Sequence, residues 1–222
     1  MGRGAGKRVG VVLSGCGYLD GSEIQEATVT LLALDREGAK VRAAAPDVEQ
    51  MHVVDHRLAQ PTQEKRNILV EAARIVRGQI VPLDELHACD LDALVVPGGY
   101  GVAKNLCSFA VDGPRLQVHP EVERVVREMH AARKPQGFIC IAPMIAAKVL
   151  GSHHPRLTIG NDPQTATTVR ELGGEHVECP VDEIVVDEVN LLLSTPAYML
   201  GPTIAPVAAG IERLIARLLV MA

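Results

Sequence analysis

The segment Gly-Phe-Ile-Cys-Ile-Ala-Pro-Met-Ile-Ala-Ala-Lys-Val-Leu, residues 137–150, decides the fold. Its first four residues form a short apolar run typical of a buried strand, and residues 142–150 have the pattern of a helix that stops before Gly151. Cys140 therefore lies at a sharp strand-to-helix turn, the position of the nucleophile in a nucleophile elbow. Ile141 and Ala142 replace the small residues that usually surround a serine nucleophile there.

Short apolar runs alternate with longer segments of helical period along the rest of the chain, which indicates a parallel sheet with crossover helices. Hydrophobic residues are 47% of the 222 and aromatic residues only 2%. Val, Leu, Ile and Ala must therefore fill the core, as they do in helix-covered parallel sheets. The length favours one α/β domain over residues 1–222. We expect strands at 9–13, 41–45, 93–96, 137–140, 157–159, 184–186 and 191–194, and helices at 22–38, 67–77, 120–133, 142–150, 165–172 and 203–220, with a long loop at 46–64.

Two of these expectations depend on local signals. Ser22 and Gln25 have the spacing of a capping box, which places the start of the first helix at Ser22. The polar segment 187–190 separates the last two strands and predicts a hairpin.

Composition excludes several classes of partner and site. The net charge of −5 and the pI near 5.9 give no basic surface for nucleic acid. No apolar stretch reaches the ~20 residues of a membrane span, and residues 1–8 are too short and polar for a signal peptide. We therefore expect a cytoplasmic protein that binds neither nucleic acid nor membrane. The five cysteines are odd in number and widely spaced, so we expect no disulfide framework, no metal and no cofactor.

Three segments should meet where ligands bind in an open α/β sheet, beyond the carboxyl ends of the strands: 15–26, 98–104 and 140–143. Cys140 has two interpretations there. Free N–H groups and the positive end of the helix that follows would stabilise a thiolate. Cys140 would otherwise be a small apolar core residue, which is a common fate of a buried cysteine.

Six motifs together resemble the ThiJ/PfpI branch of the class I glutamine-amidotransferase-like superfamily. Within that branch they are most similar to the ElbB-type isoprenoid-biosynthesis, glyoxalase-like proteins. They cover most of the chain from Val9 onward: Leu13-Ser14-Gly15-Cys16-Gly17, Asp20-Gly21-Ser22-Glu23-Ile24, Pro97-Gly98-Gly99, Ala103-Lys104-Asn105-Leu106, Phe138-Ile139-Cys140-Ile141-Ala142-Pro143 and Thr195-Pro196-Ala197-Tyr198-Met199.

The resemblance implies a flavodoxin-like three-layer sandwich, with a mostly parallel sheet and helices on both faces, and a homodimer. It also implies that an acid of the first helix shares a hydrogen bond with Cys140. The family's count back from Gly38 places that acid at Glu26, with Glu23 as the nearby competitor. A carboxyl pressed against a thiolate should be protonated, because adjacent anions repel each other and burial favours the neutral acid. Glu26 would otherwise be an ordinary first-turn glutamate that offsets the helix dipole.

Other site residues follow from the same resemblance. Gly99 and Ile141 would supply backbone N–H groups to a developing oxyanion. The histidines at 52, 56, 119, 153 and 154 lie in loops or at element ends, where solvated imidazoles are expected. The further pocket candidates are Cys16, Glu23, Gly98, Asn105 and Pro143.

The leading functional hypothesis is a cofactor-independent glyoxalase that acts on a small aldehyde, methylglyoxal or glyoxal. Cys140 would form a hemithioacetal, Glu26 would shuttle the proton and a 2-hydroxy acid would be released. The alternative is a non-enzymatic redox-sensing or regulatory protein, of isoprenoid metabolism or a stress response, in which Cys140 is oxidised. A third hypothesis, an amidotransferase-like subunit, is disfavoured because Ile141 follows the cysteine where related proteins carry a histidine.

Overall fold

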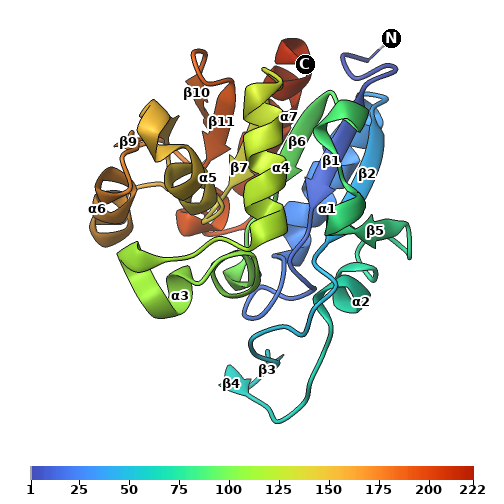
Figure 1. Cartoon of the computed structure of the whole chain (residues 1–222), viewed down its shortest axis with the longest axis vertical. Helices are drawn as coiled ribbons and strands as arrows, with labels where there is room; N and C mark the ends of the chain where they lie inside the picture. The colour runs from blue at the N-terminus through green and yellow to red at the C-terminus, as the bar shows by residue number, and fades with distance from the viewer. Residues whose placement is uncertain (1) are drawn as a thin grey trace.

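The computed structural model describes residues 2–222 and is built on one large sheet (Figure 1). Within these residues the sheet has seven strands in the order β10-β11-β7-β6-β1-β2-β5. Every neighbouring pair is parallel except β10 and β11, which form the antiparallel hairpin that the sequence predicts. The strands are β1 (Arg8–Val12), β2 (Lys40–Ala45), β5 (Ile80–Pro82), β6 (Ala93–Val96), β7 (Gln136–Ile139), β10 (Val185–Asp187) and β11 (Leu192–Thr195).

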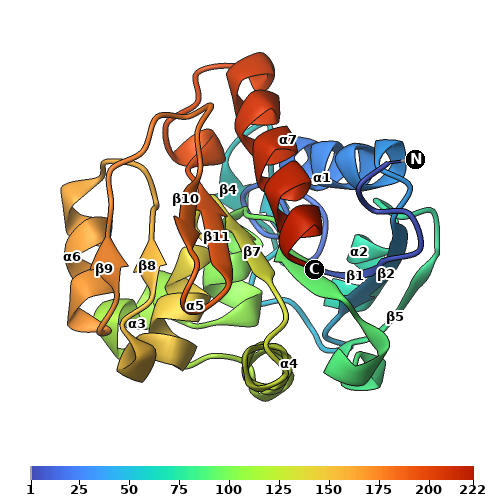
Figure 2. The same ribbon diagram turned by 90° about the horizontal axis from the view of Figure 1, so that it is seen from above.

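Helices cover both faces of this sheet, so the predicted flavodoxin-like α/β fold is confirmed (Figure 2). Helices α1 (Ile24–Arg36) and α7 (Ile204–Met221) pack together on one face, and α2 (Ile68–Ala72) adds to the same core. Helices α4 (Pro120–Ala131) and α5 (Pro143–Leu150) cover the other face. The short α3 (Phe109–Asp112) and α6 (Pro163–Glu171) lie beyond α5 (Figures 1 and 2).

The central strands are buried on both faces, which explains their continuous apolar runs. In β6, Ala93 and Val95 belong to the core under α1 and α7, whereas Leu94 and Val96 belong to the core under α4 and α5. All four side chains are fully buried. This two-sided burial is the property that separates a helix-covered parallel strand from an alternating edge strand.

The first helix begins later than the capping-box spacing predicts. Glu23 is its N-cap, and Glu23 Oε2 accepts a hydrogen bond from the Glu26 N–H at 2.6 Å. Ser22 is instead buried, and its Oγ accepts the backbone N–H of Ser14 at 2.8 Å. The Ser22 hydroxyl is therefore used to hold the loop after β1, because that loop has a buried N–H to satisfy.

The other differences between the predicted and the observed elements fall in segments where the hydrophobic periodicity is weak. The helix expected at 67–77 is only α2, which passes into turns before Arg77 and Gly78, both of which have positive φ. Strand β5 follows these turns, and it is not among the strands predicted from the sequence. The predicted loop at 46–64 contains a two-stranded ribbon, β3 (Val54–Asp55) and β4 (Gln60–Pro61), and the expected strand at 157–159 is β8 (Arg156–Leu157), which pairs with β9 (Glu175–His176).

Across residues 2–222, the helices are all too short or too polar to cross a membrane.

Ser22→Ala should destabilise the fold because it leaves the buried Ser14 N–H without an acceptor. An orphaned buried donor costs roughly 1–3 kcal/mol. Denaturant unfolding of the wild type and the variant measures this loss. Ser152→Ala, at an exposed serine, is the control and should stay within about 0.5 kcal/mol of the wild type. Equal losses in the two variants would contradict the role given to Ser22.

Candidate active site

Cys140 lies between β7 and α5 with a φ of +63°, in the left-handed region. This conformation costs a non-glycine residue about 1–2 kcal/mol. Its backbone is held by a hydrogen bond from the Cys140 N–H to the carbonyl of Thr195 at 2.9 Å, on the neighbouring strand β11. The residue is only 7% exposed.

Glu26 stands beside this sulfur and is completely buried. Its carboxyl shares a hydrogen bond with the Cys140 thiol. The Glu26 Oε2 accepts the Gly98 N–H at 2.9 Å, and Oε1 accepts the Tyr198 N–H at 3.2 Å. The backbone of two different loops therefore fixes this carboxyl against the sulfur, as the family resemblance implies.

The carboxyl is neutral at physiological pH. Burial, followed by repulsion from Glu23, raises the pKa of Glu26 to about 8. Burial also raises the pKa of the Cys140 thiol well above its ordinary value, and the Glu26 carboxyl adds to the effect. Two buried acids that share a hydrogen bond titrate as a pair, so the resting site carries both protons.

The expectation that the helix favours a standing thiolate at Cys140 is therefore wrong. Pro143 carries no N–H, and the N–H groups of Ala142, Met144 and Ile145 already bond to backbone carbonyls. Among the N–H groups of this turn, that of Ile141 therefore remains available to the Cys140 sulfur. The Ile141 and Gly99 N–H groups both donate to Cys140 and lower its pKa, but they do not outweigh burial.

Two adjacent glycines make this close approach possible. A Cβ on Gly98 would lie 2.4 Å from the Cβ of Cys140 and 2.6 Å from the Glu26 Oε2. Gly99 has a φ of +106°, and a Cβ there would lie 2.4 Å from the Glu23 backbone nitrogen. The Gly98-Gly99 pair after β6 is thus required by space as well as by backbone conformation.

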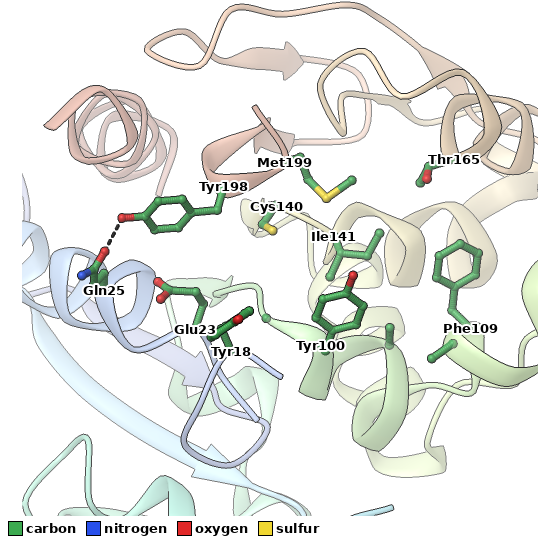
Figure 3. A pocket seen from close by; sticks show the side chains of 13 residues that line it. Tyr18, Glu23, Gln25, Tyr100, Phe109, Cys140, Ile141, Thr165, Tyr198 and Met199 are labelled. Carbon is green, nitrogen blue, oxygen red and sulfur yellow. Dashed lines mark hydrogen bonds between the residues drawn. The ribbon is translucent and has the colours of Figure 1, made fainter. Parts of the chain in front are cut away.

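Cys140 opens onto a cavity of about 620 Å³ between the ends of the sheet strands and the helices beyond them (Figure 3). In the figure, the Cys140 sulfur faces this space. The Glu23 carboxyl points toward Gln25 at one side of it, where the Tyr198 hydroxyl donates to Gln25. Its lining residues are Tyr18, Glu23, Gln25, Gly99, Tyr100, Ala103, Phe109, Ala110, Cys140, Ile141, Thr165, Tyr198 and Met199.

The structure brings together Cys140, Glu26, Gly99, Ile141 and Glu23 from the sequence analysis. Four of these line the cavity, while Glu26 lies behind Cys140. Gly98 is also behind, where it donates to Glu26.

Three of the pocket candidates lie elsewhere. Asn105 is a loop anchor, because its Nδ2 donates to the carbonyls of Ser14 and Asp20. It belongs to a π-helix at Val102–Leu106 that the sequence analysis does not predict. Pro143 is buried at the start of α5, and Cys16 lies near Glu71 of α2, outside the cavity lining.

The aromatic wall of the cavity is not predicted from the sequence. The chain has three tyrosines and two phenylalanines, and all of the tyrosines together with Phe109 line the cavity. The rarity of aromatic residues is the signal that could have identified these four side chains. In a chain with so few aromatic residues, each one is a candidate for a binding site.

No cluster of three or more His, Cys, Asp or Glu side chains in residues 2–222 is arranged to bind a metal ion.

The model of the DJ-1/PfpI family matches residues 16–197, which include Glu26, Gly98, Gly99 and Cys140. The chain belongs to the DJ-1/PfpI family. The ES1 protein homolog, mitochondrial, of Rattus norvegicus is 45% identical over 96% of this chain and 83% of its own length. The human glutamine amidotransferase-like class 1 domain-containing protein 3, mitochondrial, is 46% identical over 96% of this chain and 82% of its own length.

A solved structure agrees with this assignment. An isoprenoid biosynthesis protein with an amidotransferase-like domain, from Ehrlichia chaffeensis, superposes with a TM-score of 0.89. It is 39% identical, and the match covers 96% of this chain and 97% of that one.

The names of the curated relatives overturn the expectation of a cytoplasmic protein. Both relatives, at 45% and 46% identity, are named as mitochondrial, which contradicts that expectation. Composition could not have separated the two compartments, because a moderate negative charge and free cysteines suit the cytoplasm and mitochondria alike.

The buried Glu26 carboxyl should make the stability of the fold fall as pH rises. Glu26 keeps its proton to about pH 8 when folded, and its ordinary pKa is 4.5, so the folded state holds more protons between these values. The free energy of unfolding of the wild type should therefore decline relative to that of Glu26→Gln from pH 5 to pH 8. Denaturant unfolding across this range measures the difference, and a difference that stays constant with pH would contradict a protonated Glu26.

Proposed function

We propose that this chain is a cofactor-independent glyoxalase that converts methylglyoxal or glyoxal to a 2-hydroxy acid. The observation that carries the proposal is the neutral, buried carboxyl of Glu26 hydrogen-bonded to a cysteine that opens onto a cavity. A thiol and an adjacent proton carrier are the two groups that an internal redox reaction of a 2-oxoaldehyde needs.

The first step is addition of the Cys140 sulfur to the aldehyde carbon. Once Glu26 has lost its proton, its carboxylate takes the thiol proton as the C–S bond forms. The carbonyl π electrons move to oxygen, where the N–H groups of Gly99 and Ile141 stabilise the negative charge. Glu26 then gives the thiol proton to that oxygen, which completes a hemithioacetal and leaves Glu26 as a carboxylate for the next step.

The second step moves a proton between the two carbons. The former aldehyde carbon is bonded directly to the sulfur that Glu26 contacts, so its hydrogen comes within reach of the carboxylate although Glu26 does not line the cavity. Glu26 removes that proton to give an enediolate and returns it to the neighbouring carbon, while the hydroxyl proton of the hemithioacetal moves to the oxygen of that neighbouring carbon. The product is a thioester of Cys140, with one carbon oxidised and the other reduced and no external electron acceptor.

The third step is hydrolysis of this thioester. Water adds to the thioester carbon, the Cys140 sulfur leaves and takes back a proton, and the 2-hydroxy acid is released. The overall change is the addition of one water molecule to the 2-oxoaldehyde.

The state of Cys140 favours this function over reversible oxidation. Oxidation by peroxide depends on a standing thiolate that is open to solvent. Cys140 is nearly buried, and its pKa is raised. Catalysis needs the thiolate only while substrate is bound, and the neighbouring carboxylate supplies it by taking the proton.

The purified protein should form lactate from methylglyoxal without glutathione and in the presence of a metal chelator. Cys140→Ser should abolish this activity, because the serine hydroxyl does not replace the thiol as nucleophile. Cys89→Ser is the matched control, since Cys89 is an exposed thiol and should contribute nothing to turnover. Full activity in Cys140→Ser, or no lactate from the wild type, would refute the proposed function.

The pH dependence of kcat/KM should report the ionisation of Glu26. The reactive form is the carboxylate, so kcat/KM should rise with pH with an apparent midpoint near 8, where burial places the Glu26 pKa. Glu26→Gln should lower kcat/KM by about 10²–10⁴ and remove this rise, because the amide cannot carry the proton. A rise that survives unchanged in Glu26→Gln would assign the ionisation to another group.

A further inference from the structure

The cavity is larger than the smallest 2-oxoaldehydes require. Its volume of about 620 Å³ lies within the range of ~300–1,000 Å³ that holds drug-sized ligands. Methylglyoxal has only a few non-hydrogen atoms and would leave most of this space to water. The shape therefore favours a carbonyl compound with a substantial body.

The walls of the cavity favour an apolar body. Tyr18 and Tyr100 lie on one side, Met199 lies beside Cys140, and Phe109 lies at the far end beyond Ile141 (Figure 3). The tyrosine rings are about half exposed, so they present apolar surface to the opening. Aromatic and thioether side chains bind aryl and branched alkyl groups by burial of apolar surface.

The charges of the cavity lining narrow the choice of ligand further. Among the described residues that line the cavity, there is no lysine, arginine or histidine. Lys104 is the nearby cation, but its Nζ donates to the Leu19 carbonyl at 2.8 Å, and it is not part of the lining. A carboxylate, phosphate or diphosphate on the ligand would find no positive partner here.

The negative charge of the site rests on Glu23. Its side chain lines the cavity and caps helix α1 through the hydrogen bond to the Glu26 N–H, where the helix N-terminus stabilises a carboxylate. Burial, followed by repulsion from Glu23, keeps the more deeply buried Glu26 protonated. Burial also raises the pKa of the half-buried Glu23, but the backbone N–H groups of Glu26 and Gln25 oppose that rise, so Glu23 is the acid of the pair that carries the charge. An anion that enters this cavity therefore meets a carboxylate in its lining.

We propose that the cavity selects uncharged carbonyl compounds with an apolar aryl or branched alkyl body, and that Glu23 is the specificity-determining residue that rejects anions. The reacting carbonyl group rests on the proposed function, whereas the selection by charge and body does not. Ligands that carry phosphate or carboxylate groups are excluded from this site.

Three alkylating reagents with one reactive group test this selection without any turnover. Iodoacetamide is neutral and small, iodoacetate is anionic, and iodoacetanilide is neutral with a phenyl body. Their rates at Cys140, measured at pH 7.5 by peptide mass spectrometry, are each divided by the rate with 2-mercaptoethanol. We expect wild-type Cys140 to disfavour iodoacetate by about tenfold and to favour iodoacetanilide by about tenfold, both relative to iodoacetamide.

Two variants assign the charge selection to Glu23. Glu23→Gln should bring the iodoacetate ratio to within about threefold of the iodoacetamide ratio and leave the preference for iodoacetanilide unchanged. Asp35→Asn removes an exposed charge from the same helix outside the cavity, and both preferences should remain. Ala110→Trp should slow iodoacetanilide more than iodoacetamide, because Ala110 is an exposed residue of the cavity lining.

The outcomes separate this inference from the proposed function. Selective alkylation with no turnover of methylglyoxal or phenylglyoxal would support the cavity assignment and refute the enzyme. Turnover of methylglyoxal with equal alkylation ratios for the three reagents would support the enzyme and overturn the selection. Absence of alkylation at Cys140 by all three reagents would show that the cavity does not give access to the sulfur and would also overturn the inference.

Discussion

The site depends on one constraint, which is that a carboxylic acid is buried away from solvent beside a cysteine sulfur. Glu26 is completely buried, and its two oxygens accept N–H groups from the loops that follow β6 and β11. A charged carboxylate buried in such surroundings would cost free energy, so the Glu26 carboxyl stays protonated. The Cys140 sulfur is its hydrogen-bond partner. Proton exchange between the two groups is then the simplest chemistry that this arrangement supports.

The parallel sheet supplies this constraint by placing the ends of its central strands together. Strands β1, β6 and β7 are adjacent, and their carboxyl ends lead to α1, to Gly98-Gly99 and to Cys140. The glycines let the backbone approach the sulfur, and Cys140 itself takes a left-handed conformation. These local departures from regular backbone structure all lie at the contact between Glu26 and Cys140, and such clustering of backbone strain is typical of functional sites.

The sequence predicts the central sheet well because its strands are buried on both faces. Strand β6 coincides with the predicted 93–96, and β7 and β11 differ from their predictions by one residue at each end. Segment 67–77 is different, since its helix is short and its remaining residues form turns that lead to β5. The start of α1 was misplaced because the buried Ser14 N–H, a tertiary demand, takes the Ser22 hydroxyl.

The site could be predicted only in part for a similar reason. The strand-to-helix pattern identifies Cys140, the family resemblance adds Glu26, Gly99 and Ile141, and the structure brings the four together. The charge state of Cys140 could not be predicted, because it depends on which helix N–H groups are already bonded and on how deeply the sulfur is buried. The aromatic wall comes from segments far apart in the chain, so no local pattern unites Tyr18, Tyr100 and Tyr198.

The protonation of Glu26 can be measured directly by carbon-13 NMR of protein labelled at glutamate side-chain carboxyl groups. The Glu26 signal is assigned by its loss in Glu26→Gln and is followed from pH 4 to pH 10. We expect its chemical shift to change with a midpoint near 8, well above the ordinary glutamate value of 4.5. A Glu26 signal with its midpoint at or below that ordinary value would contradict a protonated, buried Glu26.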